Sequence, residues 1–396
     1  MAMPRVVIIG GGFAGVNAAK QLTGKAKITL IDEKDDFVFK PLLDEYIVGT
    51  VSDLCVRFPY RDILPSVTHI RGRAEDIDYK QRTVRVARTR VRYDYLIIAI
   101  GARARDFHVH DELAAHIYDI QGAEDTRKRM RTLRDRALEG HTIRVAIIGG
   151  GAVGVESAGL LKDFLNTSSN THEVVLYTAA DRLLENEKPR AGERATNILA
   201  ARGITIHYET FVTGITKKRK YRLESRQGTQ QRAEYFDEII WCAGIEPKNL
   251  GPCELEADRY LRLKGYRRVF VAGDCACHAQ PVPALAQTAI AQGRLVAHNI
   301  LRAIRGHPLR AYVPYTKGVL VTVGHLQEIY VNRGVVFSGA LAWVVHRIVY
   351  IAGMLGIERK RANILRWAGQ LFRERHIYLN HPPSTTRIKA RAKMRS

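Results

Sequence analysis

The amino-acid sequence predicts an α/β protein with parallel sheets, mainly because one pattern occurs twice. An apolar run, a glycine turn and a helical pattern follow one another in "RVVIIGGGFAGVNAAKQL" from Arg5 and in "IRVAIIGGGAVGVESAGLL" from Ile143. Two further acid-led apolar runs, "YDYLIIAIGA" (93–102) and "FDEIIWCAGIEP" (236–247), each come after one of these patterns. Strands that alternate with helices indicate parallel sheets with helices on both faces.

Both glycine turns have the spacing G-x-G-x-x-G. The first glycine of such a turn makes the tight bend, the second lets the backbone approach a pyrophosphate, and the third allows close packing of helix on strand. The phosphates then lie at the N-terminus of the helix. These roles fall to Gly10, Gly12 and Gly15 in the first copy and to Gly149, Gly151 and Gly154 in the second.

The strand that follows each turn differs at its end. "KITLIDEKDD" ends its strand in Asp32, 22 residues beyond Gly10, where an acid can bind the hydroxyl pair of a ribose. In "VVLYTAADRLL" the corresponding position, 29 residues beyond Gly149, is Thr178. Two such sites in one chain suggest one bound flavin dinucleotide and one exchanging nicotinamide dinucleotide. At the second site, loss of the acid weakens the binding of NADH and removes a repulsion against the 2′-phosphate of NADPH, which Arg182 is close enough in sequence to reach. We therefore expect tolerance of NADPH, with a preference for NADPH as the open alternative.

The overall composition limits the kinds of protein that the chain can be, but it does not identify a function. The chain has 396 residues, enough for two or three domains, and 62 Lys and Arg against 40 Asp and Glu give a net charge of +22. Such a charge favours anionic partners. Five scattered cysteines do not make a disulfide framework and fit a reducing compartment. Neither a signal peptide nor a transmembrane helix is expected.

A third segment, "RVFVAGDCACHAQPVPALAQTAIAQG", predicts a strand, a turn at Gly273-Asp274 and a helix. Asp274 would accept hydrogen bonds from a ribityl chain or order the contacts to its phosphate. The alternative is an Asx turn or a helix cap. No Cys-x4-Cys or Cys-x-x-Cys pair is present, so disulfide reduction is not expected, and no metal site is expected at Cys275-x-Cys277-His278.

The order of these motifs resembles the two-dinucleotide-binding-domain flavoproteins, the superfamily of pyridine nucleotide–disulfide oxidoreductases. Within it, the chain resembles the type II NADH:quinone oxidoreductases over about residues 5–376. The resemblance rests on "FVFKPLL", "YDYLIIAIG", "GGGAVGVESAG", "AGDCA", "ALAQTAIAQG" and "YTKGVLVTVG". It implies that NAD(P)H delivers a hydride to FAD and that the reduced flavin passes two electrons to a quinone.

The resemblance also implies the domain organisation. A Rossmann-like FAD-binding domain is expected at 1–115 and 256–325, with a Rossmann-like NAD(P)H-binding domain inserted at 116–255 and a membrane-associating region at 326–396. The residues expected to bind the two dinucleotides are Gly10, Gly12, Phe13, Ala14, Gly15, Asp32, Glu33, Lys40, Pro41, Leu42, Ala74, Ala99, Gly101, Gly149, Gly151, Ala152, Val153, Gly154, Thr178, Ala243, Gly244, Gly273, Asp274 and Ala286.

Four residues are expected to act in the reaction. Lys317 matches the family's lysine near the flavin, and Glu156 matches the acid that follows the second glycine turn, where it would orient the nicotinamide or relay protons. Gln287 and Gln292 lie in the helix that the family places before the quinone pocket. The first glutamine of the family's usual pair is Ala291 in this chain, which puts the identity of the acceptor in doubt.

The C-terminal region predicts two amphipathic helices. One apolar stripe consists of Leu341, Val344, Val345, Ile348, Val349 and Ala352, and "KRANILRWAGQLFRERH" makes a second, basic helix. Such helices suit a membrane interface, although two surface helices closing the core would give the same pattern. From Glu358 to Ser396 there are eleven Lys or Arg against two Glu, which suits an anionic leaflet. We expect a peripheral protein on the cytoplasmic side.

The expected partners are therefore a quinone, an anionic membrane surface and a second copy of the chain as a homodimer. Two alternatives stay open at this point. One is a soluble FAD-dependent reductase that feeds another acceptor, such as a ferredoxin-like protein. The other is a flavin-bound sensor or nucleic-acid-binding protein without turnover. The basic runs "RKRMRTLRDR" and "KKRKYR" lack an aromatic-interleaved or helix-turn-helix module, so a nucleic acid is not the expected partner.

Overall fold

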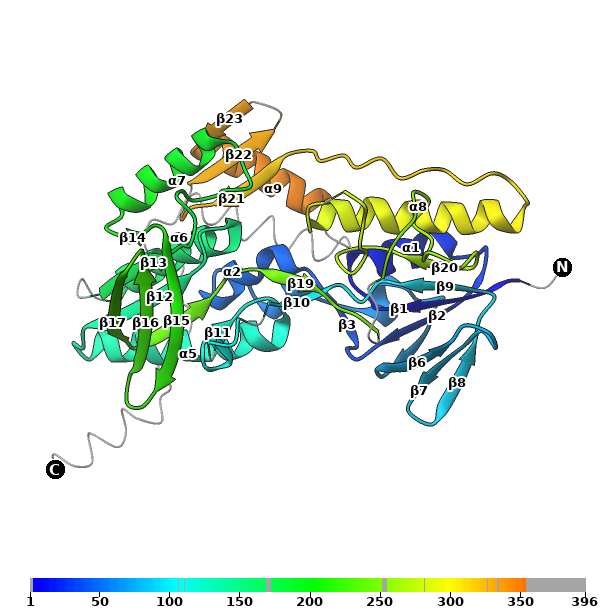
Figure 1. Ribbon diagram of the computed structural model, residues 1–396, viewed down its shortest axis with the longest axis horizontal. Coiled ribbons are helices and arrows are strands. Elements are labelled where there is room, and N and C mark those ends of the chain that lie inside the picture. The colour runs from blue at the N-terminus through cyan, green and yellow to red at the C-terminus, as the bar shows by residue number, and fades with distance from the viewer. Residues whose placement is uncertain are drawn as a thin grey trace.

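A computed structural model describes residues 3–105, 107–109, 111–168, 172–250, 255–280, 282–325, 327–332 and 335–353. Two parallel five-stranded sheets form the centres of the two lobes that Figure 1 shows side by side. The predicted α/β fold class is thereby confirmed. The basic helix at 360–376 and the tail that follows it lie outside the described residues.

The first sheet has the order β20-β9-β1-β2-β5, and all its strands are parallel. Its strands are β1 (Arg5–Ile9), β2 (Lys27–Asp32), β5 (Thr68–Arg71), β9 (Tyr95–Ile98) and β20 (Val269–Val271). The run "VVII" of β1 is buried at every position, as expected for a strand with helices on both faces. Since β20 comes after the whole second sheet in the chain, residues far apart in sequence build this first sheet.

Two helices lie against each other on the first sheet, α1 (Phe13–Leu22) and α8 (Ala286–Ile304). Gly293 permits their close approach, because a Cβ atom there would lie 2.2 Å from the carbonyl oxygen of Ala14. This contact fixes the helix that carries Gln287 and Gln292 beside the first glycine turn.

The second sheet has the order β11-β18-β12-β13-β14 and is also parallel. Its strands are β11 (Ala115–His116), β12 (Ile143–Ile148), β13 (His172–Tyr177), β14 (Thr205–His207) and β18 (Glu238–Trp241). Three helices belong to this lobe: α5 (Ile120–Leu138), α6 (Ala152–Asn166) and α7 (Pro189–Ala201). The domain boundaries expected from the sequence stay a prediction.

Antiparallel strands complete both lobes. They form three three-stranded sheets: β6 (Ala74–Asp78), β7 (Thr83–Val86) and β8 (Thr89–Arg92); β15 (Thr210–Lys217), β16 (Tyr221–Gln227) and β17 (Gln230–Phe236); β21 (Val319–Thr322), β22 (Glu328–Asn332) and β23 (Val335–Ser338). Two pairs join β3 (Asp36–Val38) to β4 (Arg57–Pro59) and β10 (Ala102–Ala104) to β19 (Ile245–Pro247). The β10–β19 pair lies where the chain passes between the lobes (Figure 1).

Short helices connect these strands: η1 (Lys40–Leu42), α2 (Leu43–Ile47), α3 (Asp53–Val56), α4 (Tyr60–Ile63) and η2 (Asp111–Leu113). Although α2 follows β2 of the first sheet and the short strand β3 in the chain, it packs on α5 and α6 of the second lobe. It therefore carries residues from the first third of the chain to the second glycine turn.

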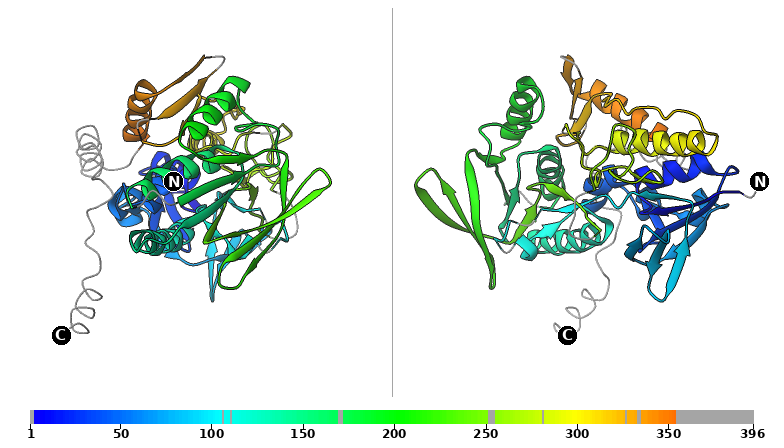
Figure 2. Two further views of the ribbon diagram at one scale, coloured as in Figure 1. Left: turned by 90° about the vertical axis from the view of Figure 1, so that its left-hand side faces the viewer. Right: turned by 45° about the vertical axis from the view of Figure 1, so that its right-hand side comes forward.

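The last described helix, α9 (Ala340–Gly353), packs on β22 and β23 at one edge of the molecule (Figure 2). Its outward side is apolar, with Leu341 exposed to 66%, Val344 to 43%, Ile348 to 61% and Val349 to 50%. Its inward side buries Ala342, Trp343, His346 and Arg347. The expected helix at this place is present, and its apolar stripe faces outward. Among the described residues, no helix combines the length and the apolar character needed to cross a bilayer.

Candidate dinucleotide and electron-transfer site

The first glycine turn has the geometry that its spacing predicts. Gly10 has φ +99°, and a Cβ atom there would lie 2.3 Å from the carbonyl oxygen of Ala99. A Cβ atom on Gly15 would lie 1.9 Å from the carbonyl oxygen of Gly10. At Gly12, by contrast, a Cβ atom would meet nothing within 4 Å, and no side chain caps α1. The N–H groups at the start of α1 are therefore open to an anion.

The second turn repeats this geometry. Gly149 has φ +119°, with the carbonyl oxygen of Cys242 2.4 Å from its would-be Cβ atom. The would-be Cβ atom of Gly154 lies 1.8 Å from the carbonyl oxygen of Gly149, while that of Gly151 meets nothing within 4 Å. No side chain caps α6. Both turns therefore combine a rigid bend with open backbone at the N-terminus of a helix.

Backbone hydrogen bonds show which strand-end residues are equivalent in the two units. The N–H of Gly10 donates to the carbonyl oxygen of Ile31 at 2.8 Å, and the N–H of Gly149 donates to that of Tyr177, also at 2.8 Å. The residue after each acceptor is Asp32 in one unit and Thr178 in the other. The structure thus places Thr178 at the position equivalent to Asp32.

The two side chains make different contacts. The carboxylate of Asp32 accepts the N–H of Gly11 at 2.6 Å and that of Lys34 at 2.9 Å. The hydroxyl oxygen of Thr178 accepts the N–H of Ala180 at 3.3 Å and no other hydrogen bond from a described residue, and Thr178 is 4% exposed. Asp32 thus holds the backbone of the glycine turn and of its own loop in place. Sequence reasoning missed this structural role, which is additional to any contact with a ribose.

Arg182 does not extend freely from the loop after β13. One of its guanidinium nitrogens donates to the carbonyl oxygens of Glu185 and Glu187 in the same loop. Contact between Arg182 and a 2′-phosphate would require these bonds to be exchanged.

The turn after β20 is held by a residue that the sequence assigned to the quinone. Gly273 has φ +81°, and its N–H donates to Oε1 of the buried Gln292 at 2.6 Å. Nε2 of Gln292 lies 3.0 Å from Nε2 of His278. Gln292 therefore fixes the turn that presents Asp274. Burial raises the pKa of Asp274, and the nearby charge of Lys40 opposes that rise.

Gln287 and Lys317, both expected to act in the reaction, lie next to each other. Oε1 of Gln287 accepts the N–H of Lys317 at 2.9 Å, and Nε2 of Gln287 donates to the carbonyl oxygen of Gly318 at 2.8 Å. The side chain of Lys317 is exposed, and Ala291 on the same helix as Gln287 is exposed as well. Gln287 thus positions the backbone that carries the lysine.

Glu156 lies in the first turns of α6, and Oε1 of its carboxylate accepts the N–H of Thr322 at 3.1 Å. Burial and the neighbouring Asp44 raise the pKa of Glu156 well above the ordinary range. Asp44 accepts the hydroxyl of Ser157 at 2.7 Å. Sequence reasoning missed Asp44 and Ser157, although two acids in the otherwise apolar run "PLLDEYIV" were a signal.

The remaining predicted residues line the same elements. The ring of Phe13 packs edge-on against Phe37, 4.9 Å between centroids. The carbonyl oxygen of Pro41 accepts the hydroxyl of Tyr350 at 3.2 Å. Ala14, Leu42, Ala74 and Ala99 are buried, Ala152 and Val153 lie in the first turn of α6, Ala286 begins α8, Glu33 and Lys40 are exposed, and Ala243 lies on the segment after β18.

These features fit two dinucleotides rather than one. Each glycine turn leaves space at its second glycine, and each helix N-terminus lacks a capping side chain. Gly101 (φ +73°) and Gly244 (φ +118°) follow the return strand of each unit, and a Cβ atom on either would meet nothing within 4 Å. Open backbone of this kind is what close approach of a ligand requires. The two lobes therefore each hold a cradle for a dinucleotide.

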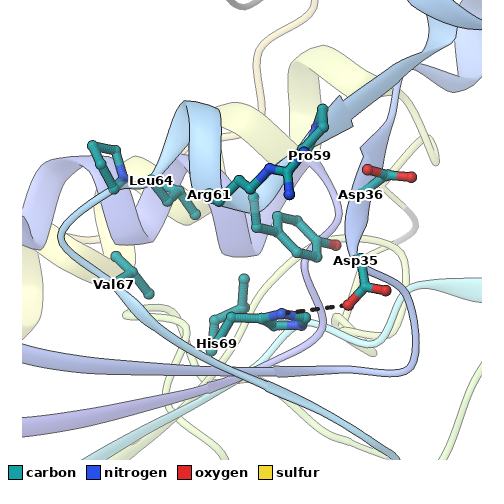
Figure 3. Close-up of a pocket in the computed structure, with 10 residues that line it drawn as sticks. Asp35, Asp36, Pro59, Arg61, Leu64, Val67 and His69 are labelled. Carbon is teal, nitrogen blue, oxygen red and sulfur yellow. Dashed lines mark ion pairs between the residues drawn. The ribbon is translucent and has the colours of Figure 1, made fainter.

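A pocket of about 450 Å³ lies beside the first cradle, and its lining residues are drawn in Figure 3. Asp35 and His69 approach each other across it, with Oδ1 and Nδ1 3.8 Å apart. Tyr60 in its wall donates its hydroxyl to the carbonyl oxygen of Gly11 at 3.0 Å. Of the residues predicted to act, none lines this pocket, and Tyr60 connects it to the glycine turn only as a support.

Residues 4–293 match the family model described as pyridine nucleotide-disulphide oxidoreductase. The chain belongs to this family. The match spans both glycine turns and ends at Gly293, where α8 meets α1. It confirms the resemblance that the motifs predicted, and it identifies the chain as a member of an oxidoreductase family.

Relatives within the pyridine nucleotide-disulphide oxidoreductases are similar over almost their whole length. The type II NADH:quinone oxidoreductase Ndh of Mycobacterium tuberculosis is 28% identical over 406 residues, covering 92% of this chain and 87% of the relative. The demethylphylloquinone reductase NdbB of Synechocystis is 27% identical and covers 88% and 92%.

Solved structures share the fold. NDH2 from Plasmodium falciparum in complex with NADH has a TM-score of 0.85 at 16% identity, covering 95% of this chain and all of that one. The sulfide:quinone oxidoreductase from Aquifex aeolicus has a TM-score of 0.74 at 18% identity, covering 99% and 96%.

Proposed function

We propose that the protein is an FAD-dependent NAD(P)H:quinone oxidoreductase. The observation that carries the proposal is the pair of equivalent dinucleotide cradles, together with Glu156 at the second cradle and Lys317 on the segment that Gln287 holds. The names of the relatives in M. tuberculosis and Synechocystis support NADH as donor and a quinone as acceptor.

The chain's own groups divide the work between binding and polarisation. When bound, FAD supplies the chemistry of accepting a hydride from NAD(P)H and of passing two electrons to a quinone. The turn from Gly10 to Gly15, with Asp32 and Asp274, holds FAD. The turn from Gly149 to Gly154 holds the pyrophosphate of NAD(P)H against the start of α6.

Two charged side chains act nearer the reaction. Lys317, whose backbone Gln287 fixes, would place a cation beside bound FAD, where it would stabilise negative charge on the cofactor. Glu156, held by the N–H of Thr322, has a pKa raised well above its ordinary range by burial and by the nearby Asp44, which favours its neutral form. A neutral carboxyl group donates a hydrogen bond and does not repel the pyrophosphate of an incoming nucleotide.

The choice between NADH and NADPH follows from Thr178. A threonine at this position offers no charged acceptor to a ribose and no repulsion to a 2′-phosphate. Arg182 is already hydrogen-bonded to carbonyl oxygens of its own loop, and this limits how much it can add to the affinity for NADPH. We therefore propose that the protein uses NADH and tolerates NADPH.

The membrane is approached through α9. Its outward apolar side chains, with Val313 and Tyr315 before β21, are exposed, and apolar side chains of this kind insert into a bilayer interface. We propose peripheral association with the cytoplasmic side of a membrane, from which a quinone is taken. Formation of a homodimer stays a prediction.

Purified protein should be yellow. NADH should bleach its flavin under anaerobic conditions, and a soluble quinone should restore the colour. Absence of flavin from protein purified without chelators or denaturants, or a flavin that quinone does not reoxidise, would contradict the proposal.

Flotation with vesicles of mixed neutral and anionic lipid tests the membrane contact. The double variant Val344→Asp/Ile348→Asp should lose flotation. The control variant Leu138→Asp, which places a carboxylate at a leucine on α5 that is about as exposed as Ile348, should retain flotation. Equal flotation of both variants would remove α9 from the proposed contact and favour a soluble reductase.

A further inference from the structure

The inward side of α9 meets a buried group of carboxylates. Arg347 donates to the carboxylate of Glu45 on α2, and its other terminal nitrogen lies 3.8 Å from Oε1 of Glu328 on β22. His346 pairs with the second oxygen of Glu328. Glu45, Glu328, His346 and Arg347 are all buried. An ion pair thus joins α2 and α9 through two residues, Glu45 and Arg347, that are 302 positions apart in sequence.

A single threonine connects these charges to Glu156. The backbone N–H of Thr322 donates to Glu156 at 3.1 Å, and its hydroxyl donates to Oε1 of Glu328 at 3.3 Å. On the other side, Ser157, the neighbour of Glu156, donates to Asp44, the neighbour of Glu45. The contacts therefore close a ring through α2, α6, β21, β22 and α9, which we call the carboxylate ring: Asp44, Glu45, Glu156 and Glu328 with Ser157, Thr322, His346 and Arg347.

The carboxylate ring contains more acid than base. Four carboxyl groups share one guanidinium and one imidazole, and charges of one sign this close together in a buried place cannot all be ionised. Burial raises the pKa of Asp44 to about 7, with the charge of Glu45 adding to the rise. The charge of Arg347 is directed at Glu45 and Glu328, whereas the pKa values of Asp44 and Glu156 are raised.

The two carboxyl groups with raised pKa values are less deeply buried than the other two. Asp44 and Glu156 are partly exposed, whereas Glu45 and Glu328 are buried. Oε2 of Glu45 and Nε2 of His346 have no hydrogen-bond partner among the described residues. Such buried polar atoms are commonly bonded to ordered water, and water bound there would extend the carboxylate ring behind Asp44 and Glu156.

The proposed reaction needs one proton that NADH does not bring. A hydride carries two electrons and one proton, whereas a quinone becomes a quinol by taking two electrons and two protons. The balance is NADH, one proton from water and a quinone giving NAD⁺ and a quinol. A group that holds a proton near neutral pH beside the second cradle can supply it.

We propose that Asp44, positioned by Ser157 and paired with Glu156, delivers this proton, and that Arg347 on α9 sets which carboxyl groups of the carboxylate ring hold it. The inference rests on the proposed function. It also gives α9 a task besides membrane contact, since the helix that faces the membrane carries the cation that orders the acids.

Other titratable groups lie on α2 and on the elements packed around it. They are Glu45 and Tyr46 on α2, Glu156 on α6, Cys242 after β18, Asp53 on α3, Arg127 on α5, His325 and Glu328 on the β21–β22 hairpin, and His346, Arg347 and Tyr350 on α9. None of the basic members forms an ion pair with Asp44 within the part of the chain that the structure describes.

The test measures the pH dependence of kcat for NADH and a soluble quinone in the flavin-loaded enzyme. A donor with a pKa of about 7 is loaded below that pH and empty above it, so kcat should fall as the pH rises through about 7. Asp44→Asn should lower kcat at pH 6 by about 10-fold or more and abolish this limb. Asp53→Asn, the same change on α3, should leave both unchanged.

Ser157→Ala keeps the proposal testable if Asp44→Asn fails to retain flavin. The hydroxyl of Ser157 lowers the pKa of Asp44, so its removal should move the limb to higher pH without removing it. Bleaching of the flavin by NADH should proceed at the wild-type rate in both variants.

The role of Asp44 would be overturned if kcat of Asp44→Asn still fell with rising pH as in the wild type. It would also be overturned if the pH at which kcat falls were the same in Ser157→Ala as in the wild type. An equal loss of bleaching and of quinone reduction would also overturn it, since the defect would then precede the proton. Failure of wild-type protein to reduce quinone contradicts the proposed function instead, and that measurement is separate.

Discussion

The two glycine units share a backbone and differ in a side chain. In both, the first glycine faces a carbonyl of the return strand, the second faces open space and the third faces the carbonyl of the first. At the end of the following strand, however, Asp32 binds two backbone N–H groups where Thr178 binds one. The comparison teaches that glycines and carbonyls fix the cradle, which leaves the strand-end residue free to select the ligand.

The sharpest way to separate the two cradles is to place the same charge in each. Gly12→Asp and Gly151→Asp both add a side chain into open space, so neither should prevent folding. A carboxylate about 4 Å from a phosphate costs ~4 kcal/mol at an effective dielectric constant of 20, roughly a 10³-fold loss of affinity. Gly12→Asp should lose flavin, measured by absorbance per protein. Gly151→Asp should keep flavin and lose bleaching by NADH; flavin loss in both would mean that the cradles do not bind separate ligands.

Making the first unit resemble the second has a smaller effect. Asp32→Thr removes a charged acceptor for two N–H groups and for a ribose, at a cost of about 1.5–3 kcal/mol. Flavin should dissociate about 10- to 100-fold more readily, measured by retention on dialysis. Asp35→Asn in the same loop, where the carboxylate pairs with Arg71, serves as control. If the two variants retain flavin equally, Asp32 has no special role.

The converse change tests the second unit. Thr178→Glu supplies a carboxylate to the ribose and repels a 2′-phosphate, so the ratio of kcat/KM for NADH over NADPH should rise about 10-fold. The matched control is Thr178→Gln, because glutamine has the same size and shape as glutamate but carries no charge. A ratio that does not move would show that Thr178 lies away from the ribose, despite its equivalence to Asp32.

Arg182 should contribute least. Because its guanidinium is bound to carbonyls of its own loop, Arg182→Ala should change kcat/KM for NADPH only about 3-fold or less. A loss of an order of magnitude confined to NADPH would mean that the loop rearranges when the nucleotide binds. Arg190, at the start of α7, is the control site.

The parts predictable from sequence were those set by local chemistry. The glycine turns, the strands around them and the helix at α9 follow from spacing and from runs of apolar residues. The outward direction of the apolar stripe of α9 did not follow, because a stripe does not say whether it faces a core or a membrane. Gln292 shows the other limit: a side chain that matched a family pattern binds the N–H of Gly273, a contact across 19 residues that no local pattern specifies.

The carboxylate ring as a whole could not be predicted, for the same physical reason on a larger scale. Asp44 and Glu45 in an apolar run are a signal of buried acids, but His346 and Arg347 in an amphipathic helix look like a solvated face, and no local pattern joins the two pairs. Only the packing of α2 and α9 around α6 and β22 brings them together.

The order of the first sheet has a consequence for the synthesis of the protein. Strand β9 pairs with β20, and the ribosome makes residues 99–268 between them. At about 5–20 residues per second, the apolar edge of β9 waits for roughly 10 to 30 s without its neighbour. An open strand edge of this kind invites pairing with other chains. The inserted lobe, whose strands lie close together in sequence, is complete before the first lobe that precedes it, so the nascent chain folds from its middle outward.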